Sequence, residues 1–147
     1  MTDFVQILED HATSLGWGFS YGNAANTNLF RSDSIVDKIY LLLDPVTRSH
    51  VGSINGGIGE TTFSGSFMLL VKSNLDNNYH NQKGQDKSSG KYEKNILPLL
   101  DSLGSLKSLI DCSDVEILSG GWVVVDAINA LDANMDGVIV TYSVKTL

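Results

Sequence analysis

The chain has 147 residues, 42% of them hydrophobic, which is enough to bury the core of one globular domain. Its 17 acidic and 10 basic residues give a formal charge of -7, and this excess of acid disfavours a general nucleic-acid-binding surface. No apolar run approaches the ~20 residues that cross a bilayer, and the first residues lack the basic start and apolar stretch of a signal peptide. We therefore expect one domain that contacts no membrane and stays inside the cell that makes it.

The first predicted element is an amphipathic helix over residues 3–15. Its apolar side chains recur at helical spacing, namely Phe4, Ile7, Leu8, Ala12 and Leu15. Asp3 and Gln6 are placed to form a variant of the capping box, and Gly16 is placed to end the helix. His11 lies at the edge of the apolar stripe and is interpreted as a boundary residue, because no second histidine or carboxylate cluster is paired with it.

Three strands are predicted to follow this helix. Aromatic residues alternate with small ones over 17–21, which favours a short first strand. After a loop over 22–34, a central strand over 37–43 is ended by Asp44 and Pro45. The segment 46–59 is interpreted as a flexible loop, since its glycine cluster lacks the lysine and the following helix of a phosphate-binding loop.

The third predicted strand, 60–72, is the longest, and its two faces differ. One face is apolar, with Phe63, Phe67, Leu69 and Val71. The other face begins with polar residues and ends with Met68 and Leu70. We expect a helix of the same chain or a neighbouring subunit to cover these two side chains, and both are candidates for a subunit interface.

The polar segment 74–90 follows and shows no periodicity, so we expect a long loop that is either functional or disordered. Tyr79 and His80 within it are further interface candidates. A second helix is predicted over 91–111, and we expect Pro98 and Gly104 to kink or segment it. Its apolar side comprises Tyr92, Ile96, Leu99, Leu100, Leu103, Leu106 and Ile110.

The chain is predicted to close with two long strands. Residues 115–118 lead through a glycine bulge at 120–121 into a strand over 122–128, whose apolar pattern predicts cover on both faces. After a polar loop over 132–137, where Gly137 is expected to supply a positive φ, the last strand alternates strictly. Its apolar face is formed by Val138, Val140, Tyr142 and Val144. The predicted fold class is α+β, one mainly antiparallel sheet packed by two helices, with helix, three strands, helix and two or three strands in order.

The residues that could carry chemistry are few. Asp132, Asn134 and Asp136, followed by Gly137, match the first half of a calcium loop, but the twelfth position is Ser143 instead of a bidentate glutamate. The histidines fall in three separate elements, and Cys112, the single cysteine, is interpreted as a small core hydrophobe. No nucleophile, base and orienting acid stand out together, so we expect no enzyme and no cofactor.

The order of the elements carries a resemblance over nearly the whole chain. The elements are FVQILEDHATSLG, WGFSYG, KIYLLLDP, TTFSGSFMLLVKS, YEKNILPLLDSL and WVVVDAINALDANMDGVIVTYSV. In order and style they resemble the tail terminator and tail-completion neck proteins of tailed bacteriophages. The phrases LLLDPVTR and LDANMDGVIVTYSV are also similar to small virion proteins of Bacteroides-type phages. The long segment 74–90 departs from the simplest members of the family.

The resemblance implies a tail-terminator-like fold and a structural virion protein made in the host cytoplasm. Such a protein assembles with copies of itself into a ring in the neck or tail, beside other neck, connector and tail proteins. DNA passes through the ring without sequence-specific binding, which agrees with the acidic composition. The alternative is a small calcium-binding or ligand-binding module that uses the 132–137 loop, and a hydrolase-like enzyme is a third interpretation.

Overall fold

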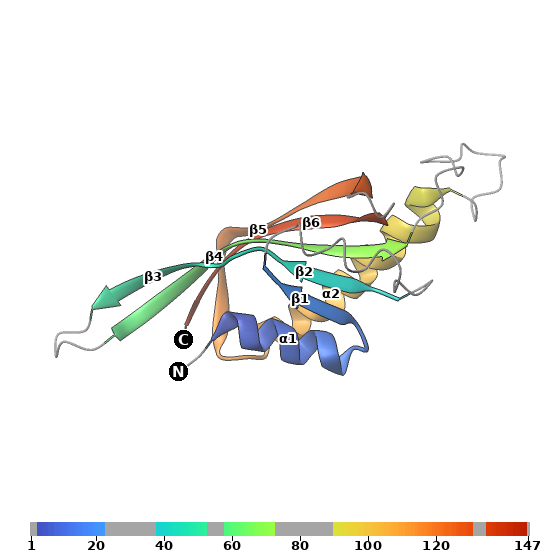
Figure 1. The fold of residues 1–147 in the computed structure, drawn as a ribbon. Coiled ribbons are helices and arrows are strands. Elements are labelled where there is room, and N and C mark those ends of the chain that lie inside the picture. Colours follow the sequence, from blue (N-terminus) through green and yellow to red (C-terminus); the bar gives the residue numbers. More distant parts are fainter. Residues whose placement is uncertain (1–2, 23–37, 53–57, 73–89, 131–134, 147) are drawn as a thin grey trace.

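The computed structural model describes residues 3–22, 38–52, 58–72, 90–130 and 135–146. In these residues, one six-stranded sheet is covered on one face by two helical segments (Figure 1). The elements in chain order are α1 (Phe4–Ser14), β1 (Gly18–Tyr21), β2 (Tyr40–Leu43), β3 (Thr47–Gly52), β4 (Ile58–Lys72), the π-helix η3 (Tyr92–Ile96), α2 (Leu97–Asp111), β5 (Val115–Ala130) and β6 (Met135–Thr146). The α+β class with a mainly antiparallel sheet is therefore confirmed.

The strand order is β1-β2-β4-β6-β5, with β3 also paired to β4. β1 and β2 run parallel, whereas β4 pairs antiparallel with β2, β3 and β6, and β5 pairs antiparallel with β6. β4 and β6, with 15 and 12 residues, thus lie side by side at the centre of the sheet. Their register joins Phe67 to Val140 and Gly65 to Tyr142.

The predicted helix at the start of the chain is confirmed, with one correction at its cap. Asp3 Oδ1 accepts a hydrogen bond from the backbone N–H of Val5 at 3.4 Å, as an N-cap residue does. Gln6 does not complete a capping box: its Nε2 donates to Asp10 Oδ1 one turn further along, at 3.1 Å. Gly16 ends the helix with a φ of 78°, the left-handed conformation that glycine adopts without strain.

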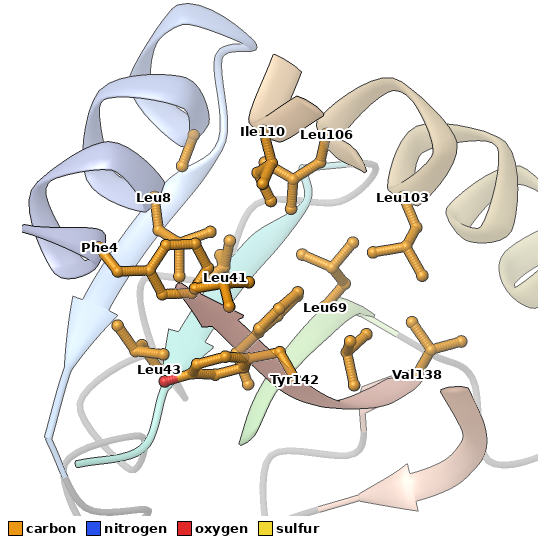
Figure 2. Close-up of a cluster of buried hydrophobic side chains, with 14 of the residues drawn as sticks. Phe4, Leu8, Leu41, Leu43, Leu69, Leu103, Leu106, Ile110, Val138 and Tyr142 are labelled. Carbon is orange, nitrogen blue, oxygen red and sulfur yellow. The ribbon is translucent and has the colours of Figure 1, made fainter. Parts of the chain in front are cut away.

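The core lies between the helices and the inner face of the sheet (Figure 2). The alternation predicted for the last strand is confirmed, because Val138, Val140, Tyr142 and Val144 are all buried there. Phe4 of α1 packs against Tyr142 with their ring centroids 4.9 Å apart. The apolar side predicted for the second helix also faces this core, where Ile96, Leu99, Leu103, Leu106 and Ile110 are buried.

The interpretation of 46–59 as a loop was wrong, because residues 47–52 form β3. All six residues of β3 are exposed, so the segment has no buried apolar face and no periodicity that could reveal a strand. Its backbone is instead held by pairing with β4, from Thr47 opposite Ser64 to Gly52 opposite Ile58. Four strands therefore precede the second helix, where three were predicted.

The second helix is segmented, as Pro98 predicted. A proline at this position has no N–H to donate to the carbonyl of Lys94, and its ring crowds that carbonyl. The turn before it widens into η3, where the N–H of Leu97 donates to the carbonyl of Tyr92, five residues back. Gly104 causes no interruption, because α2 continues through it to Asp111.

The closing strands confirm the predicted bulge and correct the expectation for Gly137. The pairing of β5 with β6 shifts between Ile117 and Trp122, and Gly120 there has a φ of 71°. Gly137 lies inside β6 and has no positive φ. A Cβ at this position would overlap the backbone carbonyl of Leu69, so glycine is required by close strand approach and not by a turn.

Candidate functional site

The outer face of the sheet, opposite the helices, carries an apolar row that crosses four strands. Leu42 lies opposite Met68, Met68 opposite Ile139, and Ile139 opposite Val125. Burial falls along the row: Leu42 is 6% exposed, Met68 and Ile139 are half-buried, and Val125 is 57% exposed. Val123, two residues before on the same face of β5, is 50% exposed. We call Met68, Ile139, Val123 and Val125 the outer apolar patch.

Of the two interface candidates in β4, only Met68 has exposed surface. Leu70 is fully buried on the outer face, in a small cluster with Tyr40, Leu42 and Met135 against which Met68 packs. Cover for Leu70 thus exists within the chain, whereas β5 lacks the cover on both faces that its sequence predicted. The reason is its place in the sheet: β5 is the last strand beyond β6, and its outer side chains have neighbours on one side only.

A second exposed feature is the hairpin arm, which consists of β3 and residues 58–64 of β4. The arm extends beyond the helices at one end of the sheet (Figure 1). Val51 near its tip is 59% exposed, and His50 Nδ1 lies 2.9 Å from Thr61 Oγ1 across the hairpin. His50 is therefore engaged in a structural contact within the arm.

The arm and β5 present free strand edges on opposite sides of the sheet. Thr62 of β4 pairs with Ser49 of β3 on one side and with Lys145 of β6 on the other. Among the described strands, β3 pairs only with β4, and β5 only with β6. With neighbouring strands ~4.8 Å apart, about 14 Å of paired sheet separates the two free edges there.

Asp136 is a described member of the predicted calcium set, and it lies inside β6 with a fully buried side chain. Its Oδ2 accepts a hydrogen bond from Asn95 Nδ2 of η3 at 3.0 Å. The predicted loop bounds of 132–137 are therefore wrong at their end, because Met135 to Gly137 belong to β6. Asp132 and Asn134 lie outside the described residues. Within the described ranges, no group of three histidine, cysteine or acidic side chains could hold a metal ion.

Of the remaining predicted residues, the structure describes His11 and Cys112. Tyr79 and His80 fall outside the described part of the chain. His11 is half-buried, as a boundary residue should be, and its Nε2 has no hydrogen-bond partner among the described residues. Cys112 is exposed just after α2, so its interpretation as a core residue was wrong. Among the residues that the structure describes, no set of candidate catalytic side chains is therefore brought together.

Sequence reasoning missed a buried hydroxyl in the core. The Oη of Tyr142 has no hydrogen-bond partner in the described part of the chain, and it lies where a Cβ on Gly65 would meet it at 3.1 Å. Burial raises the pKa of this phenol, and Tyr21 and Asp44 raise it further while Arg48 lowers it. The aromatic ring covers the glycine across the strand pair, which is a structural role.

A pocket also escaped the sequence analysis. It lies where β2 begins, β4 ends and η3 passes, and its volume is about 230 Å³. The lining residues are Ile39, Val71, Lys72, Lys94, Asn95, Pro98 and Leu99. They come from three distant segments, so no local spacing could have revealed them, although Pro98 inside a helical pattern was a signal of irregular backbone.

Comparison of the chain with protein-family models, curated proteins and solved structures finds no match. No helix in the described ranges combines the length and the apolar character needed to span a membrane.

Proposed function

We propose that this chain is a structural subunit that assembles head to tail into a ring, as part of the neck or tail of a tailed phage. The observation that carries the proposal is that β3 and β5 lie on opposite sides of one sheet, that each pairs with a single strand among the described residues, and that each has exposed valine. Val51 lies on the arm, and Val123 and Val125 lie on β5. The assignment to a phage is supported in addition by the resemblance in element order described above.

Opposite edges favour rings over simple dimers. If the arm of one subunit meets β5 of the next, the two contacting surfaces differ, and every subunit keeps one free surface of each kind. Such a heterologous contact repeats from subunit to subunit and gives a ring where the rotation between neighbours closes, or an open filament where it does not. A contact between two β5 edges would instead use identical surfaces and would stop at two copies.

The character of the two edges also supports their pairing. β3 carries Arg48 and no acidic residue, whereas β5 carries Glu116 and Asp126 and no basic residue. Strand addition would satisfy backbone groups on both edges. Burying the exposed part of each valine would contribute on the order of 1 kcal/mol.

The test is the mass of the purified protein by light scattering, followed by negative-stain imaging. We expect rings of uniform size that form as concentration rises, and Val125→Lys should abolish them by placing a charge in the apolar contact. The matched control is Leu97→Lys, because Leu97 is 41% exposed but lies in α2, away from both edges. This control should still form rings.

Two results would contradict the proposal. The wild-type protein could remain a monomer at all concentrations, alone and with neck and tail proteins, or rings could form equally well with Val125→Lys. The virion assignment has its own test, in which antibodies against the chain should label the head–tail junction of purified phage particles. If rings form but the antibodies do not label phage particles, the ring assembly stands and the phage role is wrong.

A further inference from the structure

The pocket beside η3 has a composition that selects for one kind of ligand. Four of its lining residues are apolar, namely Ile39, Val71, Pro98 and Leu99. The other three, Lys72, Lys94 and Asn95, are polar donors. A ligand that matches both groups has an apolar body and a hydrogen-bond-accepting, negatively charged end.

The π-helix helps to form this pocket. Because the turn before Pro98 is wider than an α-helical turn, η3 inserts an extra residue before α2 begins and presents Lys94 and Asn95 beside the ends of β2 and β4. Single π turns within helices occur frequently at functional sites. Asn95 is held in place by its hydrogen bond to the buried Asp136, and its Nδ2 carries a second hydrogen that this bond does not use.

The balance of charge at the pocket is positive in a chain whose formal charge is -7. Lys72 and Lys94 are both exposed, and neither forms an ion pair in the described part of the chain. The charge of Asp136, behind Asn95, opposes an anion, but two ammonium groups outweigh one carboxylate. Because both lysines border an apolar surface, an anion bound there would be partly desolvated, which strengthens its attraction to them.

We propose that this pocket binds a small organic carboxylate with an apolar chain or ring. The apolar body lies against Val71 and Leu99, and the carboxylate accepts hydrogen bonds from Lys72 and Lys94. At about 230 Å³ the pocket is smaller than the sites of roughly 300 to 1,000 Å³ that hold drug-sized ligands. The ligand is therefore short, with the size of hexanoate or benzoate.

The test is a titration of the full chain, monitored through the NMR signals of its backbone N–H groups. The charged probes are hexanoate and benzoate, and the uncharged probes are hexanamide and benzamide. We expect saturable shifts centred on residues 71–72 and 94–99 for the carboxylates only. Acetate, which lacks the apolar body, should bind at least tenfold more weakly than hexanoate, because four methylene groups are lost. Lys72→Gln and Lys94→Gln should each weaken hexanoate binding roughly threefold to fivefold.

The matched control is Lys107→Gln, because Lys107 is also an exposed lysine but lies in α2 and pairs with Asp111. This variant should bind hexanoate as the wild type does. The proposal is overturned if hexanamide and benzamide bind as tightly as hexanoate and benzoate, or if Lys72→Gln and Lys94→Gln bind hexanoate as the wild type does. It is also overturned if no saturable shift appears. Since the pocket and the strand edges are separate, the Val125→Lys variant should keep full binding, so the outcome is independent of ring assembly.

Discussion

The two faces of the sheet are buried to different extents, although the same strands form both. On the inner face, every second residue of β6 from Val138 to Val144 is buried in a core that both helices cover. On the outer face, its Ile139 is half-buried, and the neighbouring Val125 of β5 is mostly exposed. The contrast teaches that apolar content alone does not mark the core of this protein, since part of that content lies on a face that none of the described helices covers.

The largest expected contrast between the faces is in stability. Phe67→Ala removes a fully buried ring that packs edge to face on Trp122, at 5.8 Å between centroids. We expect the free energy of unfolding to fall by about 3 to 5 kcal/mol. Val125→Ala on the outer face should change it by less than about 0.5 kcal/mol in the monomer. Urea denaturation of both variants measures the difference, and equal losses would show that the outer patch is packed as a core.

A second substitution sharpens the comparison at the centre of the sheet. Gly137→Ala should lower the free energy of unfolding by about 2 kcal/mol or more, because its Cβ would push β6 away from the backbone of Leu69. Gly104→Ala is the control: nothing lies within 4 Å of a Cβ there, and alanine favours the helix by up to about 1 kcal/mol. Thermal unfolding should rank the three proteins with Gly104→Ala highest, and a stable Gly137→Ala variant would refute the close approach.

The smallest effect at neutral pH is expected at the buried hydroxyl of the inner face. Tyr142→Phe should leave the free energy of unfolding unchanged or raise it by about 1 kcal/mol, because it removes an unpaired polar group. Above pH 10, the ordinary pKa of tyrosine, the unfolded chain ionises this phenol while the folded chain keeps its proton. Stability is therefore lost as pH rises, and the variant should lose less. Denaturation from pH 8 to 11 measures both slopes, and identical slopes would count against this assignment.

The parts of the fold that the sequence predicted are those where burial enforces a period. The alternation from Val138 to Val144 and the helical spacing from Ile96 to Ile110 both face the core, so the pattern and the structure coincide. β3 was missed because both of its faces are exposed, and a strand held by backbone pairing alone leaves no apolar pattern.

The candidate site was less predictable because position in the sheet decided it. The apolar pattern of β5 predicted cover on both faces, but only its inner face packs against the core and Val123 and Val125 are exposed. The strand lies at an edge of the sheet, and strand order is not encoded in local spacing. The pocket joins Ile39, Val71 and Lys94 across more than fifty residues of chain. Met68, whose half-buried side chain lies in the outer apolar patch, had a local signal, because an apolar residue there follows polar ones on the same face.

The most direct test of the head-to-tail account uses two variants together. Val51→Lys blocks the arm and leaves β5 intact, whereas Val125→Lys blocks β5 and leaves the arm intact. If opposite edges meet, each variant alone is a monomer, and an equal mixture forms a one-to-one pair that grows no further, which native mass spectrometry would detect. If Val51→Lys alone forms a dimer, or if the mixture contains only monomers while the wild type assembles, the contact between opposite edges is wrong.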